Sequence, residues 1–215
     1  MEIAIVLGVI IISYLIGSIS SAIIISKIIS GKDIREEGSG NAGATNMLRV
    51  HGKLAGALTL IIDVLKGVIA ILIAMLFDFI LTRYVQDSGI WNGNLIYLAG
   101  LFVVIGHDFP VFFKFKGGKG VATSLGVVLM LNWQVGLIVL VCAILVMIIS
   151  RYVSLGSITA AVLYPVLFLG YMLGKAEFNV INITSALFMA ALLILKHHTN
   201  ISRLRKGTEN KLFKK

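Results

Sequence analysis

The chain has 215 residues, of which 58% are hydrophobic and 13% charged, and it carries a net charge of +9 with histidine neutral. Soluble domains have about a quarter charged residues, so this composition, with a mean hydropathy of +0.99, excludes an ordinary soluble domain and predicts an integral membrane protein. Most of the positive charge falls in short stretches between apolar runs. Membrane topology and anionic lipids account for such a pattern, and we expect no nucleic-acid partner. The single cysteine, Cys142, excludes an internal disulfide.

Apolar runs follow one another along the whole chain. A helix needs about 20 apolar residues to cross the hydrocarbon core of a bilayer. We predict an all-α polytopic membrane protein that forms a single domain over residues 1–215. Its seven transmembrane helices, some of them short, are expected at 3–25, 54–81, 95–106, 121–131, 135–149, 153–173 and 180–195.

The number of spans depends on the stretch 121–149, which a polar and aromatic break at 132–134 interrupts. The alternative to two short helices is one long tilted helix, which gives six spans. Seven spans place 16 of the 19 lysines and arginines on one side of the membrane. Six spans move Arg151 and the basic tail to the opposite side. The positive-inside rule therefore favours seven spans, with the N-terminus outside and the C-terminus cytoplasmic.

This topology brings three polar segments to the cytoplasmic face, at 31–53, 107–119 and 196–215. The first contains the run GSGNAGATNMLR at 38–49. Its glycine spacing fits a dinucleotide-binding pattern, but no strand precedes it and no βαβ unit surrounds it. One interpretation is a flexible connector. The other is an oxyanion site, because small residues are combined with hydroxyls, amides and Arg49.

The second polar segment reads GHDFPVFFKFKGGKG at 106–120. It is not a Walker A loop, since Gly120 follows Lys119 where that motif requires serine or threonine. If a helix begins at Val121, the backbone amides of 117–120 face an anion at its positive end. The alternative is a basic loop that touches lipid head groups, with His107 and Pro110 as helix punctuation.

The third polar segment reads KHHTNISRLRKGTENK at 196–211. Its His197, Asn200 and Arg203 are three residues apart, so a continuing helix would place them on one face. The other interpretation is a basic tail that only signals topology.

Two charged residues, Asp63 and Lys66, lie within the second predicted span. A charge at that depth costs about 2.5–3.5 kcal/mol unless it is paired or near water. We expect an ion pair that faces the interior of the helix bundle, and a direct catalytic role is the second interpretation.

Together the three polar segments and the Asp63–Lys66 element resemble the bacterial membrane acyl-phosphate:glycerol-3-phosphate acyltransferases across nearly the whole chain. The resemblance implies transfer of a fatty acyl group from acyl phosphate to the 1-hydroxyl of sn-glycerol 3-phosphate. The products are lysophosphatidic acid and inorganic phosphate, at the first step of phospholipid synthesis. Lys196 and His198 depart from the pattern, because arginines are common in the family at these positions.

The resemblance and the residue chemistry together suggest a role for each candidate. Ser39, Arg49, Lys119, His197 and Asn200 are the expected catalytic residues. The expected substrate-binding residues are Gly40, Asn41, Thr45, Asn46, Lys114, Gly117, Gly118 and Gly120. Structural support is assigned to Asp63, Lys66 and Glu209. The base that accepts the hydroxyl proton is either His197 or a phosphate oxygen of a bound substrate.

The expected setting is the bacterial plasma membrane, with an active site on its cytoplasmic face and membrane lipids around the spans. No cluster of acidic residues, histidine and cysteine has the spacing of metal ligands, so we predict no metal and no cofactor. We also expect no obligate protein partner. The rival function is a membrane transporter for phosphate or a small phosphorylated anion, which membrane-embedded charges and an anion-binding loop would suit.

Overall fold

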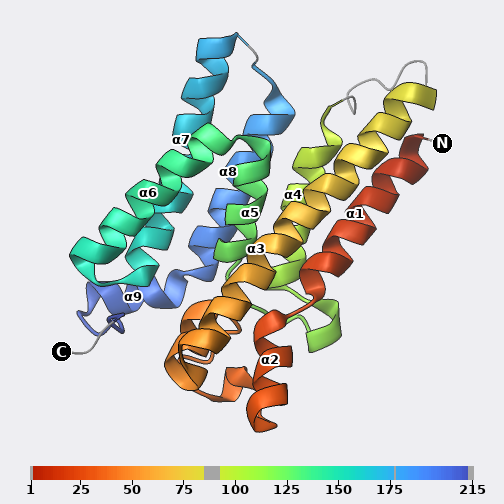
Figure 1. Cartoon of the computed structure of the whole chain (residues 1–215). Coiled ribbons are helices and arrows are strands. Elements are labelled where there is room, and N and C mark those ends of the chain that lie inside the picture. Colours follow the sequence, from red (N-terminus) through yellow and green to blue (C-terminus); the bar gives the residue numbers. More distant parts are fainter. Residues whose placement is uncertain (1, 85–92, 177, 213–215) are drawn as a thin grey trace. The chain divides into compact units, whose positions relative to one another are not determined.

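A computed structural model describes residues 2–84, 93–176 and 178–212 of the chain. All regular structure in these residues is helical, and the chain divides into two compact units, Met1–Leu131 and Asn132–Lys215 (Figure 1). The first unit contains α1 (Glu2–Ser18), α2 (Ser21–Ser30), η1 (Ile34–Glu36), α3 (Ala44–Tyr84), α4 (Leu95–Asp108), η3 (Val111–Phe113) and α5 (Val121–Leu131). The second contains α6 (Trp133–Ser150), α7 (Val153–Lys175), α8 (Val180–Lys196) and α9 (His198–Arg205).

Glycines allow the helices of the first unit to pack closely. A Cβ atom on Gly17 of α1 would overlap the carbonyl oxygen of Val103 on α4, and one on Gly106 of α4 would overlap that of Tyr14 on α1. Small residues of this kind let helix backbones approach in membrane proteins, where van der Waals packing drives association. The close contact fixes the end of α4, from which the second polar segment starts.

The helix α3 packs against α5 by the same device. A Cβ atom on Gly67 of α3 would overlap the carbonyl oxygen of Thr123, and one on Gly126 of α5 would overlap that of Val64. The helix α5 follows the part of the second polar segment at 114–120, called here the glycine–lysine loop, and is therefore held against the middle of α3.

The prediction of one continuous helix over 3–25 is wrong. Instead α1 ends at Ser18, Ser20 is extended with φ −89° and ψ 97°, and α2 begins at Ser21. The break is explained by Lys66 of α3. Its Nζ donates hydrogen bonds to the carbonyl oxygens of Gly17 and Ile19, each at 3.1 Å. The break releases these two carbonyls from the helical hydrogen-bond pattern.

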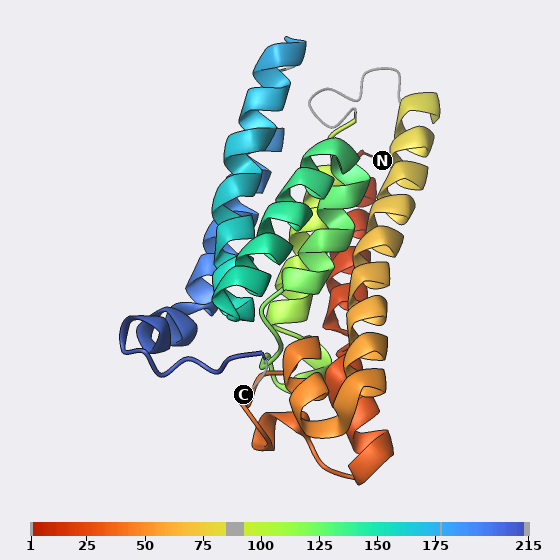
Figure 2. The same cartoon turned by 60° about the vertical axis from the view of Figure 1, so that its left-hand side comes forward.

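The helix α3 begins earlier than the apolar run at 54–81 indicated. It starts at Ala44 and is kinked at Gly52, whose φ of 87° and ψ of −175° are not helical. Only glycine adopts such a conformation without strain. Residues 44–51 thus form a short helix that contains the second half of the GSGNAGATNMLR run at 38–49. In both Figure 1 and Figure 2, α2 and the start of α3 lie at the same end of this unit as the loop around η3.

The second unit begins at the predicted polar break. The side chain of Asn132 caps α6 by accepting a hydrogen bond from Val135 N at 2.9 Å, which satisfies one of the amides that a helix start leaves without a partner. The helix α7 packs between α6 and α8. The chain then bends by 56° between α8 and α9.

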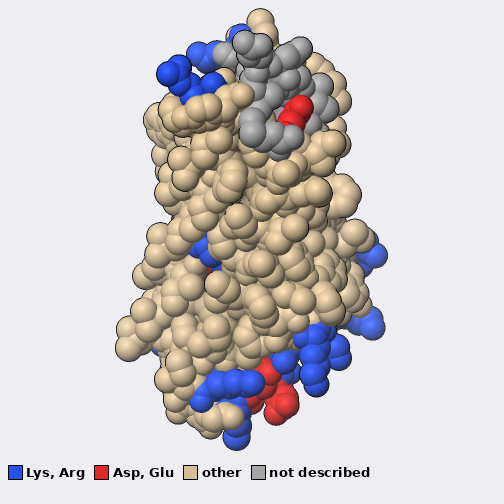
Figure 3. Space-filling model, turned by 90° about the vertical axis from the view of Figure 1, so that its right-hand side faces the viewer, with Lys and Arg blue, Asp and Glu red and all other residues tan. Residues whose placement is uncertain are grey.

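Each of the seven predicted apolar stretches contains a helix. By length and composition, five helical stretches among the described residues are able to cross a membrane, or six if α8 and the bent α9 form one span. The short α5 is not among them. Large exposed apolar side chains line the long helices, including Leu58, Leu65 and Leu72 on α3. Figure 3 shows one face of the molecule, on which uncharged residues form a broad band and most charged residues lie near the two ends.

Candidate active site

The first polar segment is held in place by Arg35, which the sequence analysis did not identify. Its guanidinium forms a two-pronged ion pair with Asp33, Nε to Oδ1 at 3.0 Å and Nη2 to Oδ2 at 2.7 Å. Its Nη1 donates to the carbonyl oxygens of Phe113 and Lys116, both at 2.9 Å. The hydrogen bond between the two side chains lowers the pKa of Asp33 and raises that of Arg35. Arg35 therefore ties the first polar segment to the second.

Asn46 organises the loop that carries Ser39. Its Oδ1 accepts from Ser39 N at 2.8 Å, and its Nδ2 donates to the carbonyl oxygens of Ile34 and Glu37 at 3.2 and 2.9 Å. The side chain is buried. These contacts, all within its own segment, indicate that Asn46 shapes the loop. Around it Ser39, Gly40 and Arg49 are exposed, whereas Asn41 and Thr45 are half-buried.

The second polar segment folds back on the end of α4. Lys114 and Phe115 both adopt left-handed conformations with φ 57°, which non-glycine residues rarely do. Gly117 N then donates to the carbonyl oxygen of Asp108 at 3.3 Å, and Gly118 N to that of His107 at 3.1 Å. The expected cradle of outward-facing amides at 117–120 is therefore incomplete, because two of its amides point to α4. The groups left for an anion at this loop are the half-buried Lys119 and the backbone amides of the first turn of α5.

The first two polar segments meet at Gly118. A Cβ atom there would overlap His107 Nε2 and would lie 2.8 Å from the carbonyl oxygen of Ala42, which belongs to the first segment. Only a residue without a side chain fits between them. The structure thus brings the 38–49 and 106–120 segments together within one unit.

The third polar segment lies in the second unit, where a bend at His197 separates α8 from α9. His197 caps the end of α8 and the start of α9, whereas Asn200 and Arg203 lie within α9. The His197 side chain is buried, with Nδ1 at 2.8 Å from the carbonyl oxygen of Leu193. A carbonyl only accepts, so Nδ1 carries the proton and the lone pair of the neutral ring is on Nε2. That tautomer suits a general base that acts through Nε2.

Glu209 binds three parts of the second unit together. Its Oε1 accepts from Asn200 Nδ2 at 2.6 Å and from Ser154 Oγ at 2.9 Å, and its Oε2 accepts from Arg203 Nε at 2.6 Å. Burial alone would raise the pKa of Glu209, but the hydrogen bonds from Asn200, Arg203 and Ser154 outweigh it and the pKa lies below its ordinary value. Glu209 therefore orients Asn200 and joins α9 to the start of α7.

The lowered pKa of Glu209 predicts a pH dependence of stability. The interaction contributes fully above the ordinary carboxyl pKa of 4.5 and is lost as the pH falls through the lower value of the folded state. We expect Glu209→Gln to lower the thermal unfolding midpoint in detergent by about 2–8 °C at neutral pH. The difference in unfolding midpoint between wild type and variant should become smaller below about pH 5. A gap that stays constant down to about pH 3 would contradict this role.

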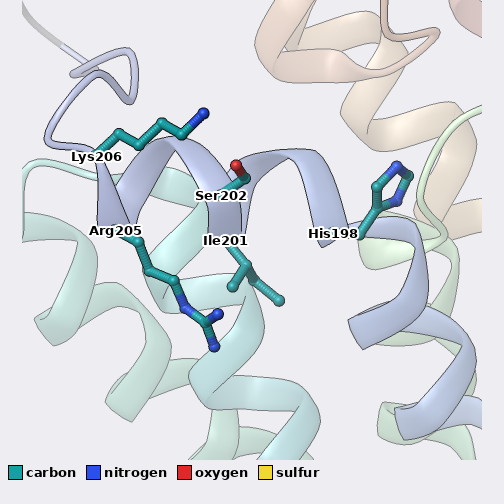
Figure 4. Close-up of a pocket in the computed structure, with 5 residues that line it drawn as sticks. All are labelled: His198, Ile201, Ser202, Arg205 and Lys206. Carbon is teal, nitrogen blue, oxygen red and sulfur yellow. The ribbon is translucent and has the colours of Figure 1, made fainter.

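The opposite face of α9 lines a pocket of about 360 Å³, formed by His198, Ile201, Ser202, Arg205 and Lys206 (Figure 4). None of these residues was a sequence candidate for the site. Among the described residues, no group of three or more histidine, cysteine or acidic side chains is placed to hold a metal ion.

Known proteins resemble this chain over almost its whole length. The family model described as glycerol-3-phosphate acyltransferase matches residues 7–207. Proteins named glycerol-3-phosphate acyltransferase from Thermoanaerobacter sp. (strain X514) and Coxiella burnetii (strain RSA 493 / Nine Mile phase I) are 46% and 43% identical. The first match covers 95% of this chain and 94% of the relative, the second 94% and 96%.

Two crystal structures of PlsY (YgiH), an integral membrane glycerol 3-phosphate acyltransferase, share the fold. The glycerol 3-phosphate form has a TM-score of 0.81 and is 40% identical, and the lysophosphatidic acid form has a TM-score of 0.77 and is 38% identical. Each comparison covers 96% of this chain and 94% of the solved one.

Proposed function

The chain belongs to the glycerol-3-phosphate acyltransferase family, and we propose that it transfers a fatty acyl group from acyl phosphate to the 1-hydroxyl of sn-glycerol 3-phosphate. The products are lysophosphatidic acid and inorganic phosphate. The observation that carries the proposal is the junction at Gly118, where a glycine–lysine loop and a loop of hydroxyls and amides meet in one unit. The solved relatives were crystallised with the acceptor and with the product of this reaction.

The reaction requires one bond to form and one to break at the acyl carbon. The 1-hydroxyl oxygen attacks that carbon, the bond to the phosphate oxygen breaks, and phosphate leaves with the electron pair. Phosphate is a good leaving group, so strong activation of the nucleophile is less necessary than with a poor leaving group. The main task of the protein is to neutralise two phosphate groups and the developing oxyanion.

In the first unit, Lys119 and Arg49 supply the positive charge that phosphate requires. Ser39 is exposed on a loop whose shape Asn46 sets, and its hydroxyl is one donor for the oxyanion. In the second unit, Asn200 is the alternative donor. His197 accepts the hydroxyl proton at Nε2, which its Nδ1 contact with Leu193 favours, unless a phosphate oxygen of the substrate takes it.

The donor is tested by comparing three acyl sources with the purified protein in detergent. We expect lysophosphatidic acid from acyl phosphate and glycerol 3-phosphate, and none from acyl-CoA or acyl carrier protein. Equal rates with acyl-CoA would contradict the proposed donor while leaving the acyltransferase class intact.

We also propose a single domain with seven membrane spans, an outside N-terminus and a cytoplasmic active site in the plasma membrane. The helices at all seven predicted stretches support this count. Helix α5 has 11 residues, and at 1.5 Å per residue it rises about 16 Å. It is thus the shortest of the proposed spans and is too short to cross the hydrocarbon core by itself. The polar backbone at its ends must therefore be shielded from lipid by neighbouring helices.

Single cysteines report this topology, in a background where Cys142→Ser removes the native thiol. We expect a membrane-impermeant thiol reagent to label Lys175→Cys in intact cells and to leave Lys32→Cys and Lys206→Cys unlabelled. All three positions are exposed, and permeabilised cells provide the control because every site should then react. Labelling of Lys206→Cys in intact cells, with none at Lys175→Cys, would support six spans instead.

A further inference from the structure

A network of buried charges lies behind the glycine–lysine loop of the first unit. Lys66 Nζ is 3.0 Å from Asp63 Oδ1 and 2.7 Å from His107 Nδ1. Ser21 Oγ donates to Asp63 Oδ1 at 2.9 Å. Asp63, Lys66 and His107 are only 1%, 5% and 6% exposed. The predicted Asp63–Lys66 ion pair is present, and it extends to a histidine at the end of α4.

The network fixes the orientation of the His107 ring. An ammonium group donates and never accepts, so Nδ1 of His107 accepts from Lys66 and the proton of the neutral ring is on Nε2. Lys66 is itself held by Asp63 and by the carbonyl oxygens of Gly17 and Ile19 at the break after α1. A buried ammonium with this many partners has little freedom to move.

His107 in turn determines where the loop lies. Its carbonyl oxygen accepts from Gly118 N at 3.1 Å. Its ring contacts Gly118 so closely that a methyl group on that residue would overlap Nε2. The carbonyl oxygen therefore holds the residue next to Lys119, and the Lys66 contact at Nδ1 holds the end of α4 from which that carbonyl projects.

The helix that carries Lys66 also supports the other end of the loop. Gly67 packs on the carbonyl oxygen of Thr123, in the first turn of α5. One short stretch of α3 therefore locates both the residues before Lys119, through His107, and the helix start after it.

We infer that His107, oriented by the Asp63–Lys66 pair, is a positioning residue that holds the Gly117–Gly120 backbone and Lys119 in the conformation that binds the acceptor phosphate. The inference rests on the proposed function. His107 does not touch substrate in this account. It acts through the loop, so its loss should weaken acceptor binding more than donor binding.

Two amide variants of similar size test the inference. His107→Asn places an amide oxygen close to the position of Nδ1 and keeps an acceptor for Lys66, whereas His107→Gln places its amide near Nε2. The Michaelis constants for glycerol 3-phosphate and for acyl phosphate are measured for both variants, with thermal unfolding in detergent as the control for folding.

We expect His107→Gln to raise the Michaelis constant for glycerol 3-phosphate by about tenfold or more, and that for acyl phosphate by less than about threefold. His107→Asn should stay within about threefold of wild type for both substrates. Lys66→Met should behave like His107→Gln. Equal effects of the Asn and Gln variants, or equal losses for both substrates, would overturn the inference.

A readout without turnover separates this inference from the proposed function. Wild-type protein that forms no lysophosphatidic acid would contradict the function. Hydrogen exchange at the amides of Gly117 and Gly118 would still report on the loop. We expect faster exchange in His107→Gln than in His107→Asn, and identical exchange in the two variants would refute the positioning role.

Discussion

Replacing Lys119 with alanine is expected to raise the Michaelis constant for glycerol 3-phosphate by about 10- to 150-fold. This range corresponds to the loss of about 1.5–3 kcal/mol, typical of a hydrogen bond to a charged group. Lys119 lies between Gly118, which is fixed against His107, and Gly120, which opens α5. The backbone that carries the Lys119 side chain therefore has little conformational freedom. Lys119→Arg keeps the charge and should recover part of the loss, since arginine also binds phosphate.

The matched control is Lys53→Ala. Lys53 is an exposed lysine of the same unit, in α3 just after the kink at Gly52. Its removal should change the Michaelis constant by less than about twofold, because surface charges at a distance are screened by salt. If Lys119→Ala and Lys53→Ala have equal effects, the loop does not bind the acceptor phosphate and its charge serves only topology or lipid head groups.

Replacing His197 with glutamine is expected to lower kcat by about 10²- to 10⁴-fold, with little change in either Michaelis constant. Glutamine retains hydrogen-bonding groups but cannot take the hydroxyl proton. The contact between Nδ1 and Leu193 O at 2.8 Å places the accepting lone pair on Nε2.

The neighbouring histidine supplies the control for this variant. His198 is exposed and lines the pocket on the other face of α9, so His198→Gln should leave kcat within about twofold of wild type. Undiminished turnover by His197→Gln would remove histidine from the proton transfer. A phosphate oxygen of a bound substrate would then be the base.

The positions of most helices could be predicted because helix length in a membrane is set by the thickness of the hydrocarbon. The predicted boundary at Asn132 is confirmed, since a polar side chain between two apolar runs caps the second helix. The break between α1 and α2 was missed. Its cause is Lys66, which donates hydrogen bonds to the carbonyl oxygens of Gly17 and Ile19 from a helix more than 40 residues away along the chain.

The candidate site could be predicted only in part, because contacts between residues far apart in the chain also determine it. Lys119 and His197 could be predicted from residue type alone, because lysine binds phosphate and histidine acts as a general base. Arg35 was not identified, because the contacts that join it to the second polar segment are to backbone carbonyl oxygens 78 and 81 residues away, which leave no pattern in the sequence. His107 resembled helix punctuation until its contact with Lys66 was known. A sequence motif marks which side chains are unusual, whereas tertiary contacts decide which of them position the others.

The most direct test of the account is the product balance of the purified protein in detergent, supplied with acyl phosphate and glycerol 3-phosphate. We predict that one lysophosphatidic acid forms for each phosphate released, that neither appears when glycerol 3-phosphate is omitted, and that both are reduced in parallel in Lys119→Ala. Absence of lysophosphatidic acid, together with flux of phosphate or glycerol 3-phosphate through liposomes that contain the protein, would contradict the account and support a carrier.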